Sequence, residues 1–479
     1  MANHLDLLQK LISQIKIIQG GMGVGVSKYS LAKRVSCYGQ LGVVSATAPD
    51  NLLIRGLQHG DPNGNLREAL TKFPNQEIAK RIFDKFYISG GKAPEDRYLL
   101  NSFPHFEKIG DSEFTIANKD LEDTLVAGAF VEVYLAKQGH MNPIGANFLN
   151  KIGWAQLPTL YGGMLAGLDV ALIGAGFPKN IPEILTALVS GEICRMPAPI
   201  NGKPYQIIFD PRRIAKTKLE RPVFLGIIGN HLGVRGLPNA DGYVIEGHLA
   251  GGHNVPPRSK RISETGESIH GLEDDTNFEM LAFQLKKNGR NQPYWLAGNY
   301  ATRLAEAISL GASGIQVGTP FEFCTDSGIT PQLKRQALIE ILGGARAYTS
   351  ARASPARLPF KELQISGTMS SQEVYAERRR VCNLGFLVEV YEEGNKLLTR
   401  CSAEPEEVYV KKGGLLEDTI GRKCLCNNLL ATIGLNTPDE KPLVTSGADL
   451  TAVKDLVQRH GMEYSAENVI DYILEKART

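Results

Sequence analysis

The stretch EGHLAGGHN, residues 246–254, combines two histidines, one carboxylate and three glycines. So much glycine is unfavourable in a helix, and we expect a loop here. A neutral imidazole can remove a proton from a substrate carbon near physiological pH, which makes His253 a candidate catalytic base. A structural histidine bonded to a backbone carbonyl is the alternative. His248 and His253 are five residues apart and no third ligand is evident, so we expect no metal.

Four further glycine-rich or amide-bearing sites lie at or just after the ends of apolar runs and are typical of ligand binding. QGGMGVGVS (19–27) lets the backbone approach a ligand closely, although it is equally typical of a turn. Asn147 carries an amide that can donate and accept at the edge of a flat cofactor, or cap the next helix. LAGN (296–299) and QVGT (316–319) each end an apolar run before a helix, where backbone N–H groups favour an anion.

Eight short apolar runs predict the strands that must position these loops. Their hydrophobicity is continuous rather than alternating, which is typical of buried parallel strands, and helical patterns separate them. The runs are 15–23, 41–47, 142–149, 169–176, 222–228, 242–247, 293–299 and 313–319. This order favours a (β/α)8 TIM barrel of class α/β, with a doubly wound open sheet as the alternative. In a barrel, LAGN and QVGT follow strands seven and eight, the usual phosphate position, which favours a phosphorylated ligand bound without metal.

Two regions interrupt this alternation. Residues 51–125 are polar and irregular and follow the second run, which predicts an inserted cap that shapes the pocket. The pattern changes again after about residue 345. We therefore expect a barrel domain over 1–345 and a C-terminal extension over 346–479 packed on it.

The composition indicates which classes of protein the chain can belong to. The chain has 479 residues, 43% of them hydrophobic and 22% charged, as in ordinary globular proteins. A formal net charge of +2 gives no electrostatic case for binding nucleic acid or a membrane. We expect no signal peptide and no membrane span, and seven cysteines suit reduced thiols in a cytoplasm. Whether the chain forms a homo-oligomer is left open.

Taken together, these motifs resemble those of the nitronate monooxygenases, once called 2-nitropropane dioxygenases, and of the related FMN-dependent enoyl reductases. The matching pieces span roughly residues 15–328 and occur in the family's order. They are IIQGGMGVGVS, LGVVS, GANFL, EGHLAGGH, LAGN and GASGIQVGTPFEFCTDSG. AGGH together with GIQVGT and a following SG is the specific part of the resemblance.

The resemblance implies a (β/α)8 barrel that binds FMN without covalent attachment. It implies backbone contacts from Gly21–Gly23, a flavin near Asn147, a phosphate at Gln316–Thr319, and His253 as the catalytic base. The predicted cofactor-binding residues are Gly21, Met22, Gly23, Asn147, Glu246, Gly251, Gly252, Gly298, Asn299, Gln316, Val317, Gly318 and Thr319. Two residues depart from the family pattern, which usually has Gln where Glu246 stands and Gly where Asn299 stands. A carboxylate near the flavin would disfavour an anionic reduced ring unless it is protonated or turned away.

The predicted function is an FMN-dependent oxidoreductase (a flavoprotein monooxygenase) that oxidises nitronates or nitroalkanes with O2, His253 accepting the α-proton. An NAD(P)H-dependent enoyl-thioester or quinone reductase is the alternative, and a non-catalytic flavin-binding subunit is the second. The sequence leaves open the substrate and the electron donor. It also leaves open whether four thiols of the extension, at Cys382, Cys401, Cys424 and Cys426, bind a metal.

Overall fold

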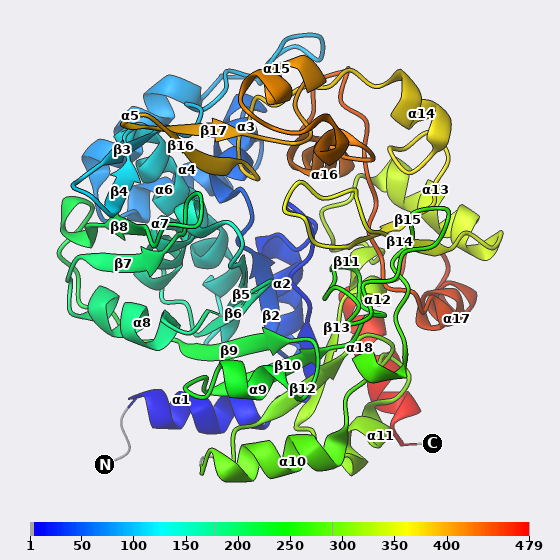
Figure 1. Ribbon diagram of the computed structural model, residues 1–479. Helices are drawn as coiled ribbons and strands as arrows, with labels where there is room; N and C mark the ends of the chain where they lie inside the picture. Colours follow the sequence, from blue (N-terminus) through cyan, green and yellow to red (C-terminus); the bar gives the residue numbers. More distant parts are fainter. Residues whose placement is uncertain (1–3, 177, 290, 479) are drawn as a thin grey trace.

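The computed structural model describes residues 4–176, 178–289 and 291–478. Eight parallel strands form one sheet in the order β1-β13-β12-β10-β9-β6-β5-β2 (Figure 1). Their bounds are β1 Ile17–Gln19, β2 Gly42–Ser45, β5 Ile144–Leu149, β6 Val170–Gly174, β9 Val223–Ile228, β10 Gly242–Glu246, β12 Tyr294–Ala297 and β13 Gly314–Val317. Each strand falls within one of the eight predicted runs.

The two ends of this sheet meet and close it into a barrel. Leu41, just before β2, forms a parallel bridge with Ile18 of β1. Its N–H donates to Ile17 O at 3.1 Å and its carbonyl accepts from Gln19 N–H at 2.9 Å. The predicted (β/α)8 barrel is therefore confirmed, and the doubly wound open sheet is excluded because an open sheet keeps two free edges.

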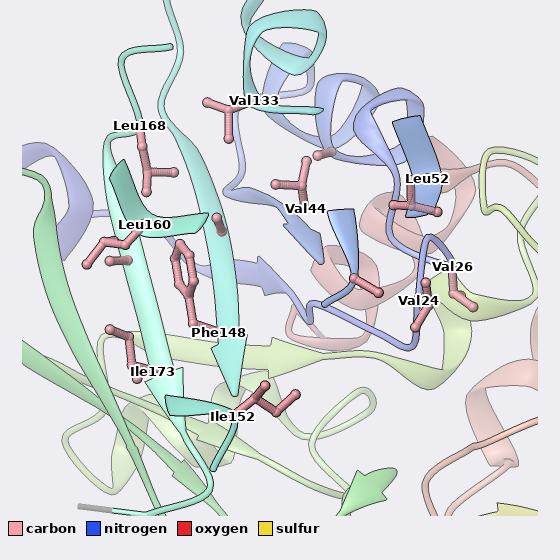
Figure 2. Close-up of a cluster of buried hydrophobic side chains, with 14 of the residues drawn as sticks. Val24, Val26, Val44, Leu52, Val133, Phe148, Ile152, Leu160, Leu168 and Ile173 are labelled. Atoms are coloured by element: carbon pink, nitrogen blue, oxygen red, sulfur yellow. The ribbon is translucent and has the colours of Figure 1, made fainter. Parts of the chain in front are cut away.

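The barrel strands are apolar on both faces because both faces are buried. Val43 of β2, Leu172 of β6 and Trp295 of β12 belong to a cluster inside the barrel, which α1 (His4–Ser13) covers at the N-terminal end. The Trp295 indole N–H donates to Ile15 O at 2.9 Å, just beyond α1. The alternate residues of these strands, such as Val44 and Ile173, point outward and belong to a larger cluster, part of which Figure 2 shows. Burial on both sides explains why the runs do not alternate.

Helices surround the barrel and complete the chain. They are α2 Tyr29–Cys37, α6 Lys119–Lys137, α7 Gly153–Leu165, α8 Ile181–Val189, α9 Gly233–Gly236, α10 Phe278–Lys287, α11 Leu304–Ser309, α12 Thr319–Glu322, α13 Pro331–Leu342, α14 Gln372–Glu377, α15 Glu406–Lys411, α16 Leu425–Thr432, α17 Thr451–His460 and α18 Ala466–Lys476. Within the part of the chain that the structure describes, none of the helices has the length and apolar character needed to cross a membrane.

Residues 51–125 follow β2 as an insertion, but the predictions that this region is irregular and that it shapes the pocket were wrong, since it contains helices and strands and none of its residues lines the cavity at the strand ends. The region contains α3 (Pro49–Gln58), α4 (Asn65–Lys72) and α5 (Gln76–Phe86), followed by β3 (Phe106–Lys108) and β4 (Glu113–Ile116). Short stretches rich in Gly, Pro and Asn separate the helices and dominate the local composition. The helical signal is nevertheless there, since α5 buries Ile78, Ile82 and Phe86 at four-residue spacing.

A second sheet joins three distant parts of the chain. Its order is β16-β17-β3-β4-β8-β7, where β16 is Glu389–Glu393, β17 is Lys396–Arg400, β8 is Gln206–Phe209 and β7 is Cys194–Pro197 (Figure 1, upper left). Glu392 stabilises this sheet by accepting hydrogen bonds from Lys108, from Lys203 at 2.6 Å and from the Tyr205 hydroxyl at 2.9 Å. Strands β7 and β8 come between β6 and β9 in the sequence and were not predicted from it.

Packing of α6 on α3 gives a test of this arrangement. A Cβ at Gly128 of α6 would lie 2.3 Å from Pro49 O, a backbone atom of α3. We expect Gly128→Ala to lower the free energy of unfolding by about 1–3 kcal/mol through overpacking, measured by urea denaturation. Gly163→Ala in α7 is the matched control, since its Cβ would meet side chains and no backbone atom, those of Leu168 at 3.3 Å and Val133 at 3.7 Å. Equal effects of the two substitutions would contradict the close α3–α6 approach.

Candidate active site

One large cavity lies at the carboxyl ends of the barrel strands. It is lined by residues at or just after the carboxyl ends of β1, β2, β5, β6, β9, β10, β12 and β13, together with residues of the C-terminal extension. About 190 Å³ of it is open to the centres of water molecules. Because one water centre needs only about 10–15 Å³, the cavity has room for a ligand far larger than a few waters. Active sites of barrels occupy this position.

The structure brings every predicted site residue to this cavity. Gly21, Met22, Gly23, Asn147, Glu246, Gly251, Gly252, His253, Gly298, Asn299, Gln316, Val317, Gly318 and Thr319 all line its wall. They come from five separate segments, each formed by the end of a barrel strand or the loop after it. Parallel strands place their carboxyl ends together, which explains why residues so distant in sequence converge.

Two of these glycines are required by the protein's own packing. A Cβ at Gly21 would lie 2.3 Å from the Asn147 Cβ, and a Cβ at Gly251 would lie 2.8 Å from the Ser446 carbonyl carbon. At both positions a side chain would collide with protein rather than fill the cavity. The sequence interpretation attributed these glycines to close approach of a ligand, whereas here they allow two chain segments to meet.

The C-terminal extension holds the loop that carries His253. Strand β11 (Gly252–His253) pairs antiparallel with β15 (Phe360–Leu363), which pairs with β14 (Ala347–Ser350). The Thr445 hydroxyl accepts from Gly252 N–H at 2.7 Å and donates to Lys361 O at 2.7 Å. On each side of this point, Ala448 N–H donates to Leu249 O at 2.9 Å and Asn254 N–H donates to Pro359 O at 2.8 Å. The extension therefore fixes the loop over residues 249–254.

His253 is held from two sides within the cavity wall. Its Nε2 lies 2.7 Å from the Ser354 Oγ, and its ring packs edge-on against Phe360 at 5.0 Å between centroids. Burial lowers the pKa of His253 to about 4. The imidazole is therefore neutral at physiological pH and can exchange a hydrogen bond or a proton with a bound molecule.

The charged residues that line the cavity are acidic. Among the described lining residues there is no Lys or Arg, whereas Glu246, Glu322 and Asp449 are present. Burial raises the pKa of Glu246 to about 7 and that of Glu322 well above its ordinary value. Both carboxyls can therefore hold a proton near neutral pH. Glu246, which stands where the family usually has Gln, thus does not place a full negative charge in the cavity.

Some polar groups of the cavity wall lack a partner within the described structure. Gln316 is 8% exposed and its Oε1 accepts no hydrogen bond, and Oε1 of the 2% exposed Glu322 is also unpaired. Helix α12 begins at Thr319 without a side-chain cap, which leaves its first N–H groups for another acceptor. Buried polar atoms are normally paired, so these positions fit a polar ligand.

The extension also gives the cavity an apolar wall that the sequence did not predict. The lining residues from this wall are Phe360, Phe386, Leu387, Leu425, Cys426 and Leu429. They come from β15, α16 and the segment before β16, and most of them are buried. A cavity lined by both these apolar side chains and the glycine-rich loops with their amides suits a ligand that has one polar and one apolar part.

The functional residues that sequence reasoning missed lie in the extension. Ser354 contacts His253, Thr445 holds Gly252, and Gly447 N–H donates to the Thr319 hydroxyl at 2.8 Å. SARASPAR and LVTSGAD carry no spacing that points to the barrel, so only the folded chain identifies them.

The four thiols of the extension lie close together, since the Cys401 thiol, burial and the thiols of Cys424 and Cys426 together raise the pKa of Cys382. The cysteines are not disulfide-bonded. Over the described residues, no group of three His, Cys, Asp or Glu side chains is arranged to hold a metal ion.

No protein-family model and no curated protein matches the chain. Solved structures similar to it include FabK from Thermotoga maritima, with 15% identity, a TM-score of 0.47 and coverage of 98% of this chain and 96% of that one. A nitroalkane oxidase from Streptomyces ansochromogenes has 14% identity, a TM-score of 0.46 and 98% coverage of both chains. The enoyl reductase domain of MlnA, from the macrolactin biosynthesis cluster of Bacillus amyloliquefaciens, has 11% identity, a TM-score of 0.48 and coverage of 98% and 95%.

These neighbours include a nitroalkane oxidase and an enoyl reductase domain. The strand pairing identifies the barrel, and the residues that meet in the cavity identify the candidate site.

The contact through Thr445 can be tested by removing one hydroxyl. Thr445→Val leaves the Gly252 N–H and the Lys361 carbonyl without their partner, and we expect the free energy of unfolding to fall by about 1–3 kcal/mol. Hydrogen exchange should quicken at residues 249–254. Thr445→Ser keeps the hydroxyl and serves as the control. Unchanged exchange in Thr445→Val would contradict a loop fixed by the extension.

Glu246 predicts a specific dependence of stability on pH. Its folded-state pKa of about 7 lies above the ordinary 4.5, so its contribution to stability is complete below 4.5 and is lost as pH rises through about 7. Glu246→Gln removes this loss. We expect the difference in unfolding free energy between the variant and the wild type to be larger at about pH 8.5 than at about pH 5.5, by about 1–2 kcal/mol in favour of the variant. Urea denaturation measures it, and parallel pH profiles would show that Glu246 ionises normally.

Proposed function

We propose that the protein is an FMN-dependent oxidoreductase that reduces a conjugated acceptor, such as an enoyl thioester or a quinone, with NAD(P)H as electron donor. The observation that carries this proposal is the construction of the cavity. The strand-end loops line it with backbone groups, amides and carboxyls, and the extension adds the apolar side chains of Phe360, Phe386, Leu425 and Leu429. His253 lines the same cavity as a neutral imidazole.

The residues present fit FMN. The uncapped start of α12 beside Gly318 offers N–H groups to a phosphate, which suits a cavity whose described lining has no cationic side chain. The Gln316 amide carries an unpaired oxygen. The Asn147 side chain, packed against Gly21, presents an amide at the same wall. We therefore assign the phosphate to Gln316–Thr319 and the ring to Gly21–Gly23 and Asn147.

In this proposal the protein positions the reactants and moves protons. FMN, when bound, would supply the two-electron redox chemistry. His253 exchanges a proton or hydrogen bond with the substrate, while Phe360 and Ser354 hold its ring in place. Leu425, Leu429 and Phe386 exclude water and receive the apolar part of the substrate. The raised pKa of Glu246 keeps that carboxyl mostly uncharged below about pH 7.

Two observations favour the reductase over nitronate oxidation. A small nitroalkane has no use for the broad apolar wall. In addition, burial lowers the pKa of His253 to about 4 without a carboxylate among its causes, so the imidazolium formed by deprotonating a neutral nitroalkane gains little stabilisation. Nitronate oxidation remains the second candidate because a preformed nitronate needs no base and the motif resemblance supports it.

Spectroscopy and turnover test these proposals in one experiment. We expect purified protein to show flavin absorbance and to release FMN on denaturation. Anaerobic NADPH should bleach the flavin, and a medium-chain 2-enoyl thioester should restore its colour. Restoration only by O2 together with consumption of a nitronate would support the second candidate. Bound flavin inert to every donor would support a non-catalytic flavin-binding subunit, and colourless protein that added FMN does not reconstitute would contradict all three.

His253→Asn separates binding from chemistry. Since His253 is held by protein contacts rather than by the phosphate-binding loops, we expect the variant to retain FMN with unchanged stoichiometry. Its turnover should fall by about 10²–10⁴-fold, the usual contribution of a general acid or base. Wild-type turnover would remove His253 from the mechanism.

A further inference from the structure

Ser354 is a buried serine of the extension that touches the proposed reaction site. Its side chain is 0% exposed, and its Oγ lies 2.7 Å from Nε2 of His253. Its own carbonyl accepts from the Arg422 guanidinium at 2.6 Å, which anchors the residue. Ser354 is therefore fixed relative to the ring that it contacts.

The other bonds of Ser354 determine which way this hydrogen bond runs. Its Oγ already accepts the Ala356 N–H at 3.1 Å. A hydroxyl has a single proton to donate, and the described residues offer that proton one acceptor, Nε2 of His253. If Nε2 carried the proton instead, the Ser354 hydroxyl would be buried with its own proton unpaired, which is unfavourable.

We propose that Ser354 is a positioning residue that fixes His253 as the tautomer with its proton on Nδ1. The hydrogen bond at one ring nitrogen sets the proton on the other. The described residues form no hydrogen bond with Nδ1, so this N–H is left for a molecule in the cavity. His253 then presents a donor to the substrate and not a lone pair.

This assignment rests on the proposed function and sharpens it. Addition of a hydride equivalent to a conjugated acceptor develops negative charge on the carbonyl oxygen of the substrate, and Nδ1–H is suited to donate a hydrogen bond to that oxygen. Deprotonation of a nitroalkane needs a lone pair facing the substrate, which this tautomer lacks. Burial supports the neutral ring, since it lowers the pKa of His253 to about 4.

The extension determines this chemistry although it contributes no part of the barrel. Phe360 on β15 packs against the His253 ring, and the β11–β15 pairing sets the backbone of the same residue. Ser354 lies between β14 and β15, so the pair of strands that holds the ring also delivers the hydroxyl. The histidine of the barrel motif AGGH is thus held by a serine that lies 101 residues later in the chain.

Nitrogen NMR of the full-length protein tests the proposal without turnover. In protein labelled with ¹⁵N-histidine, with the His253→Asn spectrum assigning the resonance, we expect His253 to carry its proton on Nδ1. In Ser354→Ala this preference should be lost or reversed. A proton on Nε2 in the wild type, or an unchanged tautomer in Ser354→Ala, would overturn the proposal.

Ser350→Ala is the matched control. The Ser350 Oγ accepts the Ala353 N–H at 3.0 Å in the same segment, but Ser350 does not line the cavity. Ser350→Ala should therefore leave the tautomer unchanged. Ser354→Ala should also lower kcat for the enoyl thioester about 10–100-fold, less than the about 10²–10³ that complete removal of one hydrogen-bond donor to a developing oxyanion costs. Its FMN content should equal that of the wild type.

The two proposals fail in different ways. Protein without FMN, or without reductase activity, would contradict the proposed function while the tautomer remains measurable. An Nε2 proton in an active flavoprotein would contradict only the role of Ser354.

Discussion

The site depends on one contact, the pairing of the loop after β10 with the C-terminal extension. Barrel strands alone bring the glycine-rich loops together, but a loop with glycines at 247, 251 and 252 has little to hold its shape. The extension supplies what is missing through β15, Thr445 and the backbone of Ser446–Ala448. Because the same segments form the apolar wall and contact His253, the extension both fixes the loop and shapes the cavity.

Much of the barrel could be predicted from the sequence because its signal is local. A strand buried on both faces is apolar throughout, as in VALIG of β6 and VFLGII of β9. The site residues could be predicted for a related reason, since strand ends of a parallel barrel must meet at one face. Once eight runs were recognised, the convergence of Asn147, Gln316 and His253 followed from topology.

The extension could not be predicted in the same way because its contacts are long-range and carry no pattern. Ser354 and Thr445 look like ordinary loop residues, and Gly251 looks like a ligand-binding glycine although Ser446 requires it. The sheet that joins β17, β3 and β8 comes from three segments, and no spacing in the sequence reveals the register. The helices α3–α5 were missed for a different reason, since turn-forming stretches between them masked their amphipathic spacing.

The distribution of charge follows from this construction. A cavity that has no cationic side chain in its described lining, with carboxyls whose pKa values are raised by burial, favours neutral groups and leaves anion binding to backbone N–H groups. The most direct test of the account is a crystal structure of the protein grown with FMN. It should place the phosphate at Gly318–Thr319 and the flavin ring between Gly21–Gly23 and the apolar wall of Phe386 and Leu429. Flavin density outside this cavity, or a ring remote from His253, would contradict it.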